Sequence, residues 1–207
     1  MKNSFVLLFT LLITSATAQE YQQIESKVHN WNGSALKKNG NRISRPILEG
    51  STMDLKYFEM RATTLSPGEE PKPLHSNADS EDMIIVKEGK VKLSVGKESK
   101  ILGLGSLIHV MPGEDHGIDN LGDVPATYLV LVMKSRKDPD PARGDKAGGS
   151  TLLEFDNIDF KPHDKGGVRK YFNRESAMCS YFEMHQTTLN TGIKSHEPHT
   201  HRAAEII

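Results

Sequence analysis

YFEMRATTLSPG, at residues 57–68, recurs 124 residues further along the chain as YFEMHQTTLNTG, at residues 181–192. Eight of the twelve positions are identical. Keeping the same spacing without a gap pairs His75 with His199, Asn77 with His201 and Glu81 with Glu205, and also Arg45 with Arg169. A match of this length at constant spacing is the signature of an internal repeat, so we infer two copies of one domain.

The second copy ends in GIKSHEPHTHRAAEII, at residues 192–207, which concentrates His196, His199, His201 and Glu205. Side chains alternate along a strand, so His199 and His201 would lie on the same face. Two imidazoles and a carboxylate suit a divalent transition metal such as Mn, Fe, Ni or Zn. The alternatives are a histidine-rich tail or a purification-tag remnant. His196 is expected at a pocket mouth or in solvent rather than as a ligand.

The composition indicates a soluble globular protein of one or two domains: 207 residues, a formal net charge of -1 and 36% hydrophobic residues. Near-neutral charge gives no reason to expect nucleic acid or an anionic membrane surface as a partner. Short apolar stretches separated by turn residues favour a β-sandwich or barrel. They lie at residues 83–89, 90–96, 106–111 and 126–133.

The first eighteen residues resemble a secretory signal peptide, with Lys2, an apolar core and a small-residue site ending at Ala18. We therefore expect export to the periplasm or medium after cleavage near Ala18, with no membrane association afterwards. Cys179 is the only cysteine, so no internal disulfide forms. We expect it to be a half-buried strand residue, with a reactive thiol as the alternative.

Residues 134–150 are rich in charge, proline and glycine, which predicts a linker between the copies. The first domain then covers residues 19–133, including an N-terminal segment that wraps around it. The second covers residues 151–207 and, by comparison with the first copy, is incomplete. We expect it to fold poorly without the missing strands, because a half-built barrel exposes sheet edges.

In both copies the repeat resembles the cupin family, and the whole chain resembles a truncated two-domain cupin, or bicupin. The family's first motif is matched by Gly68, His75, Asn77, Glu81 and Gly89 in the first copy, and by Gly192, His199, His201 and Glu205 in the second. Its second motif is matched by Gly105, Pro112, Gly113, His116 and Asn120. The resemblance implies an all-β jelly-roll barrel, one copy complete and the second only begun. It also implies a metal held by the first-motif residues and the second-motif histidine.

The first copy departs from this pattern because Asn77 replaces a histidine, and an amide oxygen is a weaker ligand for a transition metal. His75, Asn77, Glu81 and His116 therefore form either a poorer metal site or a barrel that has lost its metal. We expect His199, His201 and Glu205 to hold the working metal in the full-length protein.

Other polar residues leave alternatives open. His109 is expected to be packed or on the surface, with a pocket acid or base as the alternative. Arg45 and Arg169 are expected to form salt bridges, with binding of a carboxylate substrate as the alternative.

For function, the resemblance favours an exported metal-dependent enzyme acting on a small polar metabolite. The alternative is a non-catalytic cupin that binds a small ligand or metal. Cupin enzymes include dioxygenases, isomerases, decarboxylases and hydrolases, so the fold does not select the reaction. A homodimer is compatible with the sequence.

Overall fold

The computed structural model describes residues 20–68 and 72–207, and the chain in these ranges is nearly all β. The signal peptide predicted at residues 1–18 lies outside the described residues. Within them, no helix is long and apolar enough to cross a membrane. The all-β fold class predicted from the sequence is confirmed.

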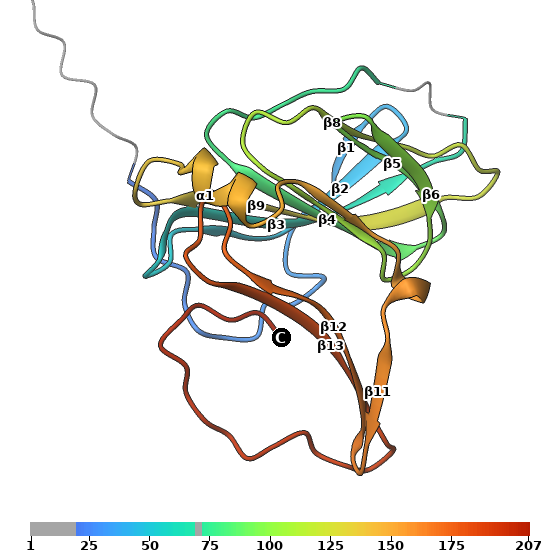
Figure 1. Ribbon diagram of the computed structural model, residues 1–207. Coiled ribbons are helices and arrows are strands. Elements are labelled where there is room, and N and C mark those ends of the chain that lie inside the picture. Colours follow the sequence, from blue (N-terminus) through green and yellow to red (C-terminus); the bar gives the residue numbers. More distant parts are fainter. Residues whose placement is uncertain (1–19, 69–71) are drawn as a thin grey trace, which may run out of the picture.

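A seven-stranded sheet forms the centre of the molecule, with strand order β1-β2-β3-β9-β4-β7-β10 and every neighbouring pair antiparallel (Figure 1). Its strands are β1 (Lys37–Asn39), β2 (Arg42–Gly50), β3 (Leu55–Leu65), β4 (Glu81–Glu88), β7 (Leu107–Val110), β9 (Ala126–Ser135) and β10 (Thr151–Leu153). The apolar segment at residues 126–133 became β9, between β3 and β4. A strand covered on both faces needs apolar residues at consecutive positions, which explains why this segment does not alternate.

A smaller sheet of β5 (Val91–Val95), β6 (Glu98–Leu102) and β8 (His116–Asp119) faces the large sheet, in the order β6-β5-β8. Inward-facing residues of the two sheets form one core, and Leu65, Val86, Val91, Leu93, Leu102, Ile108 and Tyr128 are each at most 1% exposed within it. Two antiparallel sheets packed face to face over such a core have the architecture of a jelly roll. Among the described residues no hydrogen-bonded strand pair joins the two sheets, so the barrel is not closed there.

The connection predicted as a linker is ordered. It carries helix α1 (Pro141–Lys146), which begins with proline at a position where a missing N–H costs nothing and is capped by the Asp140 side chain. Arg143 fastens the helix by donating to the carbonyl oxygens of Ser176 (2.7 Å) and Ala177 (2.9 Å). The chain then contributes β10 to the large sheet, so that sheet extends past the predicted domain boundary at residue 150.

A third sheet, of β11 (Phe160–His163), β12 (Gly166–Arg174) and β13 (Phe182–Leu189), follows a single 3₁₀ turn at Phe155–Asn157. We call it the C-terminal sheet. Its β12–β13 register reproduces that of β2–β3: Arg42 pairs with Leu65 as Gly166 pairs with Leu189, 124 residues later. Each strand pair also contains a register shift at the corresponding place, between Pro46 and Leu48 in the first and between Lys170 and Phe172 in the second. The strand pairing therefore repeats at the spacing of the sequence match.

The C-terminal sheet packs on the large sheet, on the side opposite β5, β6 and β8 (Figure 1). A second apolar cluster lies between them and includes Phe58, Met83, Leu107, Leu131 and Met133 from the large sheet and Tyr171, Phe172, Phe182 and Met184 from the C-terminal sheet. Strands β10 to β13 thus lie against the first domain, and the expectation that residues 151–207 fold poorly stays a prediction.

Candidate functional site

Strand β4 separates the charged residues of the first copy between two faces. Asp82 shares its face with Ile84 and Val86, which belong to the core between the two barrel sheets. Glu81 shares the opposite face with Met83 and Ile85, which contact the C-terminal sheet. Because successive strand residues point to opposite sides, only one of these two carboxylates can face the barrel interior.

The side chains of His75, Asn77, Asp82 and His116 form a polar cluster in which Asp82 and His116 are buried, Asn77 is half-buried and His75 is exposed. We call it the barrel cluster. Backbone hydrogen bonds in both directions between His75 and His116, of 3.0 and 2.9 Å, bring the rings to a centroid distance of 4.3 Å. Asp82 Oδ2 accepts from Asn77 Nδ2 at 2.7 Å and lies 3.3 Å from His116 Nε2. Ser80 Oγ donates to Asp82 Oδ1 at 3.2 Å. Three of the four residues predicted for this site are therefore together, and Asp82 stands where Glu81 was expected.

The electrostatics make Asp82 and His116 a buried ion pair. Burial by itself would lower the pKa of His116, but the hydrogen bonds to Asp82 and to the Glu114 carbonyl outweigh it and raise that pKa. Burial would also raise the pKa of Asp82, yet the bonds from His116, Asn77 and Ser80 hold it below its ordinary value. The pKa of His75 is lowered by burial and by the neighbouring His116 charge, so this ring stays neutral. The cluster thus offers a neutral imidazole beside a charged pair.

These residues do not fit a transition metal as they are arranged. His116 Nδ1 donates to the Glu114 carbonyl at 3.2 Å and Nε2 faces the carboxylate, so neither ring nitrogen offers a free lone pair. Asn77 turns its amide N–H toward Asp82 rather than its oxygen toward a cation. Within residues 20–68 and 72–207, no three or more His, Cys, Asp or Glu side chains converge, as they lie, on a point where they could hold a metal ion.

Glu81 lies instead in a network between the large sheet and the C-terminal sheet, in which Glu81 and His109 are fully buried and Arg174 is half-buried. Its Oε1 accepts from the Met178 N–H at 2.7 Å, and its Oε2 lies 3.1 Å from His109 Nε2. His109 Nδ1 lies 2.9 Å from Arg174 Nη2. A guanidinium only donates, so Nδ1 must accept, and the His109 proton is on Nε2. The rings of Phe172 and Phe182 cover the imidazole at centroid distances of 5.6 and 5.2 Å.

His109 therefore has the packed role expected of it, as a neutral link between a buried carboxylate and a half-buried guanidinium. Removing an unpaired charge from water is costly, so the opposite charges of Glu81 and Arg174 explain how either is tolerated there. Cys179 borders the same interface, in a turn rather than in the expected strand. Burial raises the pKa of its thiol to about 11, which keeps it protonated and unreactive.

The histidines at the end of the chain lie close together on the surface. His201 Nε2 is 3.3 Å from Glu205 Oε2, and these two side chains are 47% and 45% exposed. The rings of His199 and His201 are 4.5 Å apart, and His196 follows at 4.3 Å from His199. The three predicted ligands are thus adjacent without converging on one point, and His196 is exposed as expected.

Two of the residues that matter here, Asp82 and Arg174, were not predicted from the sequence. Asp82 directly follows Glu81, and strict alternation backward from Val86 would have placed it inside the barrel. The intervening residues 83–86 are all apolar, so the sequence itself gives no sign of which parity faces inward. Nothing in the sequence distinguishes Arg174 from the surface arginines.

Comparison with known proteins identifies the barrel. Residues 62–132 match the family model described as Cupin domain. This segment is a cupin domain. A search of curated proteins finds no match to the chain.

Solved structures with similarity to the chain include several cupins at low sequence identity. A Pseudomonas aeruginosa protein described as glyoxylate-induced is 13% identical, with a TM-score of 0.48 over 66% of this chain and 52% of its own. The chain therefore spans about half the length of that protein. An RmlC-like cupin from Shewanella frigidimarina is 16% identical, with a TM-score of 0.44, over 57% of this chain and 97% of that one. A protein from Thermotoga maritima described as a predicted oxalate decarboxylase is 14% identical, with a TM-score of 0.44, over 52% and 99%.

Proposed function

We propose that this protein is an exported two-domain cupin that acts on a small polar metabolite and divides its work between two sites. In this proposal the exposed side chains of His199, His201 and Glu205, which do not converge as they lie, turn toward one another to hold a divalent transition metal. The barrel cluster of His75, Asn77, Asp82 and His116 is metal-free and binds polar groups by hydrogen bonds. The repeated strand register of β2–β3 and β12–β13 supports the two-domain part of the proposal.

One contrast carries the division of labour. In the barrel cluster, Asp82 and His116 already satisfy each other, with Asp82 5% and His116 2% exposed. A metal that bound there would have to displace the proton between Asp82 and His116 and break the bonds from Asn77 and Ser80. The free energy that this costs opposes metal binding. At the chain end the three donors are exposed and adjacent, so a cation can reach them without breaking a buried ion pair. When bound, such a metal polarises a carbonyl or carboxylate oxygen or activates water.

The barrel residues supply complementary hydrogen-bonding groups. The neutral, exposed His75 offers one donor and one acceptor, and the His116–Asp82 pair beneath it provides a fixed dipole. A polar ligand entering beside His75 would therefore be oriented without rearrangement of the pair. This arrangement also supports the second candidate function, a non-catalytic cupin that captures a small polar ligand.

Metal titration by calorimetry, with Mn²⁺, Ni²⁺ and Zn²⁺ in turn, tests the proposal on the purified chain and three variants. His201→Ala should abolish the saturable heat, whereas Asp82→Asn should leave it unchanged. His29→Ala, which removes a half-buried histidine outside both sites, is the matched control. Binding that survives His201→Ala and disappears in Asp82→Asn would contradict the proposal.

The pH dependence provides an independent measurement. Imidazoles must be neutral to ligate, so metal affinity should fall as the pH drops through about 6. Affinity that is unchanged down to about pH 4 would show that the histidines are not ligands.

To separate enzyme from binding protein, the metal-loaded chain is assayed for turnover of small carboxylates and amides. Turnover lost in His201→Ala supports the enzyme. Ligand binding without turnover supports the second candidate.

A further inference from the structure

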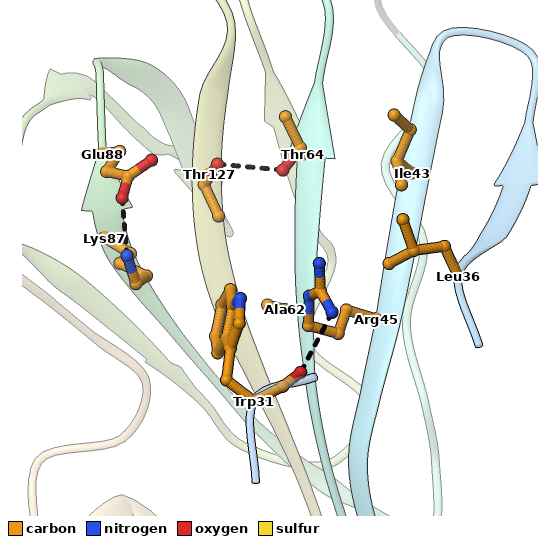
Figure 2. A pocket seen from close by; sticks show the side chains of 9 residues that line it. All are labelled: Trp31, Leu36, Ile43, Arg45, Ala62, Thr64, Lys87, Glu88 and Thr127. Carbon is orange, nitrogen blue, oxygen red and sulfur yellow. Dashed lines mark hydrogen bonds and ion pairs between the residues drawn. The ribbon is translucent and has the colours of Figure 1, made fainter. Parts of the chain in front are cut away.

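A cavity of about 340 Å³ lies on the outer face of the large sheet. The barrel cluster of His75, Asn77, Asp82 and His116 is on the other side of that sheet. Figure 2 shows its floor, formed by Ala62, Thr64 and Thr127, and the Trp31 indole along one side. Lys87 and Glu88 lie on one flank, and Arg45, Ile43 and Leu36 on the other. Its volume is at the lower end of the range for small-molecule sites, which corresponds to a ligand with one ring. We call this cavity the Trp31 groove.

Two cations meet at the indole. The Arg45 guanidinium carbon is 5.1 Å and the Lys87 ammonium nitrogen 5.2 Å from the Trp31 ring centroid. Arg45 is held by Nη1, which donates to the Trp31 carbonyl at 3.0 Å and to Asn32 Oδ1 at 3.3 Å. Within the described part of the chain neither Arg45 nor its counterpart Arg169 forms a salt bridge, contrary to our expectation.

The C-terminal sheet shows what can fill such a place. At the repeat spacing of 124 residues, Arg169 corresponds to Arg45, Phe155 to Trp31 and Phe160 to Leu36. The Arg169 guanidinium lies over two rings, 4.6 Å from Phe155 and 4.8 Å from Phe160. Phe160 fits because Gly167 lies beneath it, where a Cβ would come within 2.1 Å of the ring.

The first copy lacks the second ring. Leu36 is smaller than phenylalanine and 52% exposed, and Ile43 takes the position of Gly167. The guanidinium of Arg169 has two aromatic neighbours, whereas that of Arg45 has one, and the cavity lies where the second ring would be. A planar ring from a ligand would complete the same stacking arrangement.

Charge and hydrogen bonding specify the rest of the ligand. Arg45 and Lys87 contribute two positive charges and Glu88, which accepts from Lys87 at 2.6 Å, one negative charge. The net single positive charge favours a monoanion. On the floor, the hydroxyls of Thr64 and Thr127 are 2.9 Å apart, so when one donates to the other, the second O–H is left to donate to a ligand oxygen.

From these observations we propose that the Trp31 groove binds a small aromatic monocarboxylate, with its ring against Arg45 and its carboxylate between Lys87 and the threonine pair. The groove is on the outer face of the sheet, so this inference does not depend on the function proposed for the barrel and the chain end.

Trp31 is the only tryptophan in the chain, so its fluorescence reports on this groove alone. Benzoate is the probe, and benzamide is its uncharged isostere. Trp31 is excited at a wavelength where benzoate does not absorb. We expect a saturable change in Trp31 emission with benzoate and at least about tenfold weaker binding of benzamide, because the isostere lacks the charge-assisted bonds. The absence of a saturable change, or equal binding of the two compounds, would overturn the proposal.

Variants locate the site. Lys87→Gln and Arg45→Gln should each weaken benzoate binding about tenfold. The matched control is Lys134→Gln, which removes a lysine that lies over the Tyr57 ring at 5.9 Å, outside the groove, and should leave binding unchanged. Because Arg45 also holds the Trp31 carbonyl, Lys87→Gln is the decisive variant, and unchanged affinity in it would overturn the proposal.

Discussion

Glu81→Gln should lower the free energy of unfolding by about 3 kcal/mol, although it changes a single atom. Both carboxylate oxygens accept a hydrogen bond at a site with no exposed surface, one from the Met178 N–H and one from His109 Nε2. Glutamine has only one oxygen, so its amide group must face one of these two N–H donors. The substitution therefore removes a bond to a charged acceptor, worth about 1.5–3 kcal/mol, and leaves a buried donor unsatisfied at roughly 1–3 kcal/mol.

Arg174 adds to the cost of this substitution. Burial lowers its pKa and the charge of Glu81 opposes that shift, so removing the carboxylate leaves a half-buried cation without its counter-charge. A loss of about 3 kcal/mol is a large part of the 5–15 kcal/mol by which domains are stable.

The assay is urea unfolding followed by circular dichroism. Glu98→Gln is the control, because Glu98 is an exposed residue of β6 and its substitution should change stability by less than about 0.5 kcal/mol. Amide hydrogen exchange gives a second readout: residues 166–174 should exchange faster in Glu81→Gln, since β12 would detach more readily. If Glu81→Gln were as stable as the control and its β12 amides stayed protected, Glu81 would not link the two sheets.

Three further outcomes follow from the geometry of the barrel. Asp82→Asn should lower the pKa of His116, measured by NMR of the ring protons, because the substitution removes the partner that raises it. An unchanged pKa would show that Asp82 and His116 do not form an ion pair. The stabilisation from this pair should be greatest between about pH 4 and pH 6.5. His116, with its raised pKa, loses its contribution as the pH rises through its folded-state value, and Asp82, with its lowered pKa, loses its contribution as the pH falls through its own. Urea unfolding of the wild type and Asp82→Asn across this range checks the window, and parallel pH profiles would refute it. Gly89→Ala should cost more than about 2 kcal/mol, against about 1 kcal/mol for Gly40→Ala. Both glycines have positive φ, but a Cβ at residue 89 would come within 2.9 Å of the Pro125 carbonyl oxygen, whereas nothing lies within 4 Å at residue 40. Equal losses of stability in the two variants would show that the close approach at residue 89 is relaxed at no cost.

The sequence was sufficient to predict the fold class because short-range features, such as turn residues and apolar segments, mark the strands of the cupin domain. Pro112 and Gly113 mark the turn before β8, and the apolar segment at residues 126–133 is long enough to identify a strand buried on both faces. The pairing of β12 with β13 keeps the register of β2 with β3, at the 124-residue spacing of the sequence match.

The site was only partly predictable, and the reason is strand parity. A metal motif fixes residue types and approximate spacing. A carboxylate on a strand faces inward, however, only if it is an even number of positions away from the residues that face the core. On β4, Glu81 and Asp82 are adjacent and are followed by apolar residues on both faces, so no alternation distinguishes them. The packing of the C-terminal sheet, which creates the buried position of Glu81, is a contact between distant parts of the chain.

The arrangement of residues 134–150 depends on tertiary contacts that their composition does not show. Residues 134–150 have the composition of a flexible connection, yet Arg143 bonds two carbonyl groups more than thirty residues away and fixes α1 in place. Propensity and composition describe local preference, and tertiary contacts of this kind override it.

The location of a bound metal tests the central claim most directly. Crystals of the protein grown with Mn²⁺, examined by anomalous scattering, should show a peak beside His199, His201 and Glu205 and none beside His75 and His116. A peak inside the barrel, with the Asp82–His116 pair opened to admit it, would contradict the account.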